Sequence, residues 1–159
     1  MQLKVNPERR KIILENMQLI KINSNESERS IAVIGEVVTA TIITMRQAGI
    51  TSAEFRAQNI FFSPDAKREF ITDFELYANA KLFHIIEAKG STGLAGAIPQ
   101  IQEQLIKTKC NNGCITDGYI WQFVQLIDKE LIFNGSPLCM PIQIDEIFAR
   151  IFSALNQNI

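Results

Sequence analysis

Two carboxylates and one amine are spaced along the chain in a way that suits metal-assisted hydrolysis: Asp73, Glu87 and Lys89. The segments that carry them, residues 70–77 and 82–88 with the lysine just beyond, are rich in β-branched and aromatic residues and flank a short turn sequence. We therefore predict an antiparallel hairpin. Mg²⁺ binds carboxylate, water and phosphate oxygens, and it relieves the repulsion between neighbouring carboxylates. Because a nearby lysine stabilises charge on a phosphate during transfer, the three residues suit phosphodiester hydrolysis.

The pairing register of the hairpin decides whether the two carboxylates meet. Side chains alternate between the faces of a strand, so Asp73 and Glu75 share one face. If paired residue numbers sum to 160, Asp73 lies opposite Glu87 with Cβ atoms about 5 Å apart. That register needs either a three-residue loop centred on Ala80 or a bulge, since a two-residue loop would place Asp73 beside Ile86. A surface ion-pair cluster on a solvated strand face is the alternative interpretation of these charges.

Further residues extend the pattern beyond the hairpin. Gln100 lies on a predicted helix, which is followed by the sequence Thr116-Asp117-Gly118-x-x-Trp121. Together with the Asp, then Glu-x-Lys, this order resembles the PD-(D/E)xK nuclease superfamily, in particular the N-terminal nuclease domain of type I restriction enzyme motor subunits. The resemblance covers about residues 60–127 and a Glu on the preceding helix. It implies an α/β, restriction-endonuclease-like core: a small mixed β-sheet with a central hairpin flanked by helices.

The resemblance also implies roles for individual residues. It implies a metal-dependent nuclease in which Asp73, Glu87 and Glu36 hold Mg²⁺ or Mn²⁺. The implied catalytic set is Asp73, Glu87, Lys89 and Gln100. The implied partner is nucleic acid, with DNA favoured over RNA, and a homodimer or larger complex stays open.

The sequence departs from the superfamily pattern at two positions. The proline that gives the motif its name is missing before Asp73, and the only Pro-Asp pair, at Asp65, falls in a predicted loop. Members with a Gln-x-x-x-Tyr motif carry an aromatic residue one turn after the glutamine, and here that residue is Gln104. The alternative function is therefore a catalytically inactive nuclease-like fold that binds protein or nucleic acid.

Two more polar residues on the hairpin have competing interpretations. Glu75 is either a further metal ligand or an ordinary polar strand residue. His84, the only histidine, lies on the face opposite Glu87 and is interpreted as a packed residue. We expect the face with Phe74, Leu76, His84 and Ile86 to pack against the helix that bears Val37 and Ile42.

Composition limits the class of protein. The chain has 159 residues, 47% hydrophobic and 21% charged, which suits one globular domain and excludes disorder. We expect a single domain over residues 1–159, with a nuclease-like core at about 27–133 and helices 7–22 and 143–156 as additions. The formal net charge of −1 counts against nucleic-acid binding, which usually brings a basic excess. Three cysteines cannot all pair, which favours a reducing compartment and hence the cytoplasm, and no apolar run is long enough to span a membrane.

Hydrophobic periodicity and turn residues predict the remaining elements. Asn6 and Pro7 are typical of a helix start, and Gly49 of a helix end. The predicted helices cover residues 7–22, 27 or 30 to 47, 94–107 and 143–156, with one further short turn of helix at 51–54. The predicted strands cover residues 60–62, 70–77, 82–88, 114–127 as one strand or a pair, and 131–133.

Overall fold

The computed structural model of the chain describes residues 2–20, 24–62, 68–89 and 93–157. Its helical segments are α1 (Pro7–Leu19), α2 (Glu26–Arg29), the π-helical segment η1 (Ser30–Ile34), α3 (Gly35–Gln47), the 3-10 turn η2 (Ala95–Ala97), α4 (Ile98–Thr108) and α5 (Ile144–Asn156). Its strands are β1 (Glu54–Phe62), β2 (Arg68–Ala78), β3 (Lys81–Ala88), β4 (Asn112–Thr116), β5 (Ile120–Ile127), β6 (Glu130–Phe133) and β7 (Leu138–Cys139). The expected α/β class is confirmed.

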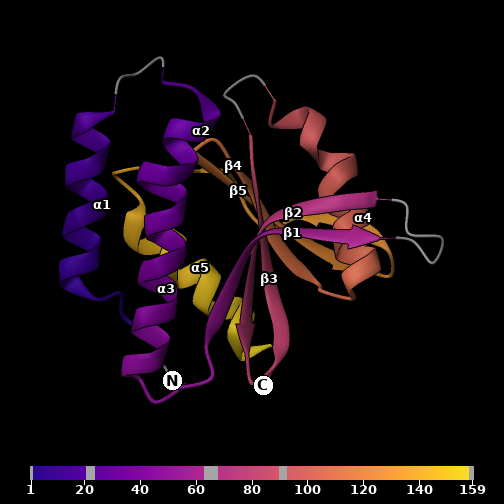
Figure 1. The fold of residues 1–159 in the computed structure, drawn as a ribbon, viewed down its shortest axis with the longest axis horizontal. Coiled ribbons are helices and arrows are strands. Elements are labelled where there is room, and N and C mark those ends of the chain that lie inside the picture. Colours follow the sequence, from indigo (N-terminus) through magenta and orange to yellow (C-terminus); the bar gives the residue numbers. More distant parts are fainter. Residues whose placement is uncertain (1, 21–23, 63–67, 90–92, 158–159) are drawn as a thin grey trace.

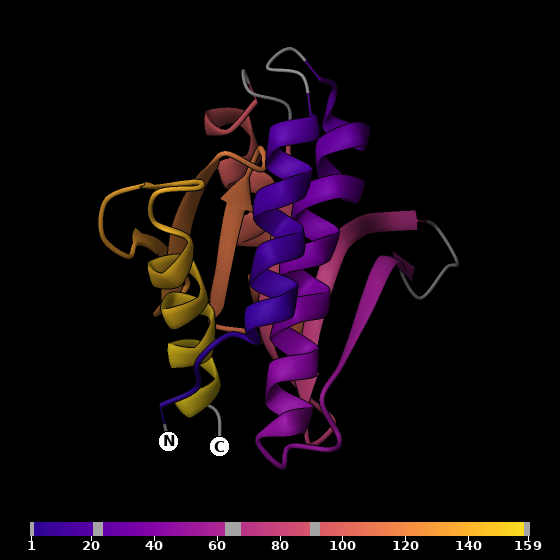
Figure 2. The same cartoon turned by 90° about the vertical axis from the view of Figure 1, so that its left-hand side faces the viewer.

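The sheet lies between two layers of helices (Figures 1 and 2). Helices α1, α3 and α5 cover one face, and α4 covers the other. The larger core cluster includes residues of α1, α3 and α5, such as Ile13, Val37 and Ile151. The smaller cluster packs Ile101 and Leu105 of α4 against the sheet. Each strand of the hairpin therefore has one face toward the three-helix layer and one toward α4.

The sheet is mixed, with the strand order β1-β2-β3-β4-β5-β6 and β7 paired with β5. Only β3 and β4 are parallel, and α4 forms the crossover between them. All other described neighbours are antiparallel. A parallel pair places the carboxyl ends of both strands at the same edge of the sheet. The expected central hairpin, β2 with β3, ends at that edge.

The helix pattern read from sequence is largely confirmed. The Asn6 side chain accepts hydrogen bonds from the backbone N–H groups of Glu8 and Arg9, both at 3.1 Å, and Pro7 opens α1. Segments α2, η1 and α3 follow one another as a nearly continuous helical stretch to Gln47. The expected apolar stripe of this stretch is buried: Ile34, Val37, Val38, Thr41, Ile42 and Met45.

Two expectations about local structure are wrong, and one strand is longer than expected. Residues 51–54 do not start a helix, because β1 begins at Glu54 and continues to Phe62 instead of covering residues 60–62 alone. The two-residue strand β7 was not expected. Both errors concern strands at the border of the sheet, where pairing partners rather than local sequence decide the conformation.

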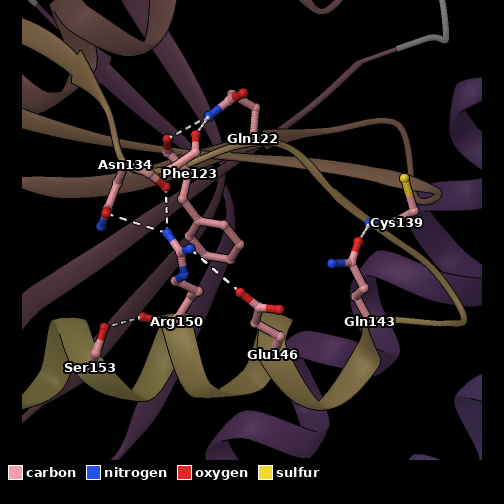
Figure 3. Close-up of polar contacts among 9 residues, drawn as sticks. Gln122, Phe123, Asn134, Cys139, Gln143, Glu146, Arg150 and Ser153 are labelled. Atoms are coloured by element: carbon pink, nitrogen blue, oxygen red, sulfur yellow. Dashed lines mark hydrogen bonds and ion pairs between the residues drawn. The ribbon is translucent and has the colours of Figure 1, made fainter.

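Polar contacts fasten α5 to the β5–β6 side of the sheet (Figure 3). The Arg150 guanidinium donates to the backbone carbonyl of Asn134 and lies 3.5 Å from Glu146 Oε1. The backbone N–H of Cys139 donates to Gln143 Oε1 at 2.9 Å, just before the helix. These contacts, with the apolar stripe of α5 in the larger core cluster, hold the last helix against the sheet.

Candidate active site

Strands β2 and β3 pair in the register that places Asp73 of β2 beside Glu87 of β3. Leu76 pairs with His84 and Phe74 with Ile86, so the paired numbers sum to 160. The turn has two residues, both with positive φ, and a bulge between Leu76 and Tyr77 restores the register. Of the two routes expected from sequence, the structure uses the bulge.

Asp73 lies against the end of β3. Its Oδ2 accepts a hydrogen bond from the backbone N–H of Ala88 at 2.8 Å, next to Glu87. Its Oδ1 accepts one from the Gln58 side chain of β1 at 3.1 Å. Gln58 has a φ of 53°, unusual for a residue other than glycine within a strand. Asp73 is thus held at the carboxyl end of β3 from both neighbouring strands.

Glu87 is buried, with 1% of its surface exposed, and it contacts two side chains. Lys89 Nζ lies 3.1 Å from its Oε1, and Gln104 Nε2 donates to its Oε2 at 2.9 Å. Burial raises the pKa of Glu87 to about 7, with a further increase from the negative charge of Asp73, against which Gln104 and Lys89 act in the opposite direction. A carboxyl group with this pKa is partly protonated at neutral pH.

Gln104 is a residue of this group that the sequence analysis did not select. It is fully buried on α4, and its Nε2 donates both to Glu87 and to the backbone carbonyl of Ile71 at 2.9 Å. The signal was present in the sequence, because Gln104 shares the buried stripe of the helix with Ile101 and Leu105. A glutamine in an apolar stripe needs a polar partner, and Glu87 provides one.

Gln100, the glutamine expected in the catalytic set, lies one turn earlier. It is half-buried on the first turn of α4, and no hydrogen bond joins its side-chain amide to the part of the chain that the structure describes. The structure thus brings Asp73, Glu87 and Lys89 together with Gln104, and leaves the Gln100 amide without a protein partner in that part.

The two glutamines should respond differently to substitution. Gln104→Met removes the donor to the buried Glu87 carboxylate and to the half-buried Ile71 carbonyl, so we expect it to lower the free energy of unfolding by about 1–3 kcal/mol and to raise the pKa of Glu87 further. Gln100→Ala is expected to leave both the free energy of unfolding and the pKa of Glu87 unchanged, because the Gln100 amide has no partner in the part of the chain that the structure describes. Urea unfolding and carboxyl NMR titration measure these effects. Equal losses of stability in both variants would contradict the assignment.

Glu75 is not a solvated strand residue. Its side chain is fully buried on the α4 side of the sheet, and its Oε2 accepts a hydrogen bond from the Tyr77 hydroxyl at 2.9 Å. Burial, together with this bond and the charge of Glu75, raises the pKa of Tyr77 to about 12. The Arg56 guanidinium lies 4.6 Å from the centre of the Tyr77 ring. Glu75 is therefore a polar strand residue that is buried and does not lie on a solvated face.

Glu36 lies apart from the other acidic residues of the expected site. It lies in the first turn of α3, and its Oε2 is 3.9 Å from Arg9 Nη1 of α1. Within the described ranges, no group of three or more His, Cys, Asp or Glu side chains is placed to hold a metal ion. A metal ion at this site would thus have Asp73 and Glu87 as its carboxylate ligands among the described residues. Asp65, the alternative to Asp73, lies outside the described residues.

His84 is a packed residue, as the sequence indicated. It is 1% exposed, and its ring centre lies 5.9 Å from that of Phe123. Neither ring nitrogen has a hydrogen-bond partner among the residues that the structure describes. Burial lowers the pKa of His84 to about 3, so the ring is neutral at physiological pH. Leu76 and Ile86 belong to the same core cluster as Val37 and Ile42, and Phe74 packs against it, so this face packs on the helical layer that contains the expected helix.

Comparison with known proteins identifies the fold. No family model matches the chain, and no curated protein sequence matches it significantly. A structure of the type IIG restriction endonuclease BpuSI matches with a TM-score of 0.58 and 15% identity, covering 87% of this chain and 19% of that one. A fragment of a putative HsdR subunit of a type I restriction enzyme from Vibrio vulnificus YJ016 matches with a TM-score of 0.53 and 12% identity, covering 87% and 26%. The chain thus spans about a fifth to a quarter of these proteins.

Proposed function

Because this chain has a restriction-endonuclease-like fold, we propose that it is a Mg²⁺-dependent nuclease of the PD-(D/E)xK type, acting on DNA in preference to RNA. The observation that carries the proposal is the placement of Asp73, in the middle of β2, beside Glu87 and Lys89 at the carboxyl end of β3.

The donor set fits a hard divalent cation. Glu87 is buried next to Asp73, and the repulsion between the two carboxylates contributes to its raised pKa. A cation between them would remove that repulsion, and Mg²⁺ commonly uses one or two protein carboxylates with water and phosphate oxygens as its other ligands. When bound, such an ion polarises a phosphate and lowers the pKa of a coordinated water.

The chain's own residues supply orientation and charge. Gln104 fixes one oxygen of Glu87, and the Ala88 N–H fixes one oxygen of Asp73, so both carboxylates are held in place before a ligand arrives. Lys89 is about one quarter exposed, so its amine can reach a phosphate at the surface while it remains 3.1 Å from Glu87. Glu87 must release its proton to hold a cation, so we expect metal binding to strengthen as the pH rises through about 7.

The direct test is cleavage of single- and double-stranded DNA and RNA by the purified chain. We expect cleavage with Mg²⁺ or Mn²⁺ and none with chelator, with DNA cut faster than RNA, because hydrolysis needs an ion between Asp73 and Glu87. Calorimetric titration with Mn²⁺ gives an independent readout of the metal. Chelator-resistant cleavage would indicate a contaminating nuclease, and absence of both cleavage and Mn²⁺ binding would refute the proposal.

One observation favours the second function, a nuclease-like module that binds protein or nucleic acid without cutting. The formal net charge of −1 is low for a protein that neutralises phosphates over a large surface. Under this alternative, Mn²⁺ binding is absent while nucleic acid or a partner chain still binds.

The cellular setting is part of the proposal. Cys110, Cys114 and Cys139 are all free thiols, which suits the reducing cytoplasm. No helix within the described ranges is long and apolar enough to cross a membrane. A homodimer or larger complex stays a prediction that sedimentation of the purified chain would test.

A further inference from the structure

Arg29 is a buried cation with no anionic partner in the part of the chain that the structure describes. Only 5% of its surface is exposed, and its Nε has no hydrogen-bond acceptor there. Other arginines have partners: Arg10 Nε lies 2.8 Å from Asp145, and Arg46 Nε donates to the carbonyl of Ala53 at 2.7 Å. An uncompensated buried charge is strongly unfavourable. The Arg29 guanidinium is therefore available to an anion from outside the described residues.

The turn after β4 holds the Arg29 side chain in place. Gly118, with a φ of 94°, leaves space for the arginine stem, since a Cβ there would lie 3.3 Å from Arg29 Cβ. The guanidinium carbon lies 5.7 Å from the centre of the Tyr119 ring. The turn is itself fixed, because Asp117 Oδ1 accepts hydrogen bonds from the N–H groups of Tyr119 and Ile120 at 2.9 and 2.8 Å. A cation–π contact orients the guanidinium plane but leaves its N–H donors available.

Arg29 lies at the turn between β4 and β5, and its helical segment borders the candidate active site. On one side, its neighbours Ser27 and Ser30 line a pocket of about 220 Å³ together with Asp73. On the other, the carbonyl of Thr116, two residues before Gly118, accepts the backbone N–H of Lys89 at 2.8 Å. Figure 1 shows α2, which ends at Arg29, beside the β4–β5 end of the sheet. The guanidinium thus belongs to the same end of the sheet as the two carboxylates.

We infer that Arg29 binds a backbone phosphate of the nucleic acid, at a position next to the phosphate that is cut. The inference rests on the proposed nuclease function and adds a substrate contact that the metal site does not supply. A guanidinium matches the geometry of a phosphate with two parallel N–H donors, and its weak hydration makes burial against a phosphate less unfavourable than for an ammonium. The phosphate would also supply the anion that Arg29 lacks.

The test compares Arg29→Met with Arg46→Met, the same change at the opposite end of the helical stretch. Affinity for a short DNA duplex is measured with Ca²⁺ in place of Mg²⁺, over a series of salt concentrations. We expect Arg29→Met to weaken binding about tenfold or more and to reduce the slope of log K against log salt by roughly 0.9, the share of one phosphate. Arg46→Met should change neither, and Arg29→Lys should restore the slope but only part of the affinity.

Two further measurements separate this inference from the proposed function. Mn²⁺ affinity without DNA should be unchanged in Arg29→Met, because the carboxylates remain. Inorganic phosphate at constant ionic strength should raise the unfolding temperature of the wild type more than that of Arg29→Met.

If Arg29→Met folds and keeps both the salt slope and the phosphate effect, the inference is overturned even when the wild type cuts DNA. If the wild type neither cuts nor binds DNA, the proposed function fails, and a phosphate effect that does not depend on Arg29 overturns the inference as well. If Arg29→Met does not fold, Arg29→Lys is measured against Arg46→Lys in the same way, and an unchanged affinity overturns the inference.

Discussion

Lys89→Met is expected to reduce phosphodiester cleavage by about a thousandfold or more while leaving the fold intact. The Lys89 amine lies 3.1 Å from Glu87 Oε1, and charge that develops on a phosphate during hydrolysis would be left unbalanced without it. The side chain is partly exposed and lies outside both core clusters, so its loss removes little packing. Single-turnover cleavage with saturating Mg²⁺ measures the effect.

The controls for this prediction use the other charges of the molecule. Lys11→Met removes a lysine that pairs with Glu15 on the exposed face of α1, and it should leave cleavage unchanged. Asp73→Ala and Glu87→Ala should abolish both cleavage and Mn²⁺ binding, whereas Lys89→Met should retain Mn²⁺ binding, weakened because the lysine no longer lowers the pKa of Glu87. Full cleavage by Lys89→Met would remove the lysine from the proposed mechanism.

The hairpin shows how far local sequence determines this site. Alternation of side chains predicted that Asp73 and Glu75 share a face, and it placed Asp73 opposite Glu87 only if the paired numbers sum to 160, which is the register that the structure has beyond the bulge. The route to this register could not be decided, because a three-residue loop and a two-residue turn with a bulge place the same residues opposite each other. The turn residues Asn79 and Ala80 both have positive φ in the structure, but their types do not indicate which of the two routes the chain takes.

The acidic residues away from the hairpin show where local sequence is insufficient. Glu36 lies between Ile34 and Val37 of the buried stripe but points to another side of the helix, which the helical period predicts. The sequence did not predict what lies on that side. The residue there is Arg9 of α1, whose packing against α3 depends on contacts more than twenty residues apart. Similarly, α4 covers Glu75, and nothing near Glu75 in sequence indicates that a helix will lie over that face. Long-range packing decides both cases.

The pH dependence of stability in the metal-free protein should contain two large contributions of opposite sign. The pKa of Glu87 is raised from 4.5 to about 7 in the folded state, so the folded state holds a proton that the unfolded state has lost, and stability falls as the pH rises through this window. The pKa of His84 is lowered from 6.5 to about 3, so the unfolded state gains a proton first, and stability falls as the pH drops below 6.5. Between about pH 5 and 6.5 the two slopes, each about 1.4 kcal/mol per pH unit, should nearly cancel.

Single substitutions should therefore uncover slopes that the wild type conceals. With chelator present, we expect Glu87→Gln to lose stability as the pH falls from 6.5 to 5, because only the His84 contribution remains, and to exceed the wild type by up to about 3 kcal/mol above pH 7. We expect His84→Leu to gain stability over the same fall in pH. Urea unfolding at half-unit pH steps measures both slopes. Saturating Mn²⁺ should reverse the Glu87 contribution in the His84→Leu variant, because the ion binds only the ionised carboxylate, so that stability then rises with pH. A wild type and a Glu87→Gln variant with the same pH profile, with and without Mn²⁺, would show that Glu87 titrates normally and that no cation binds between it and Asp73.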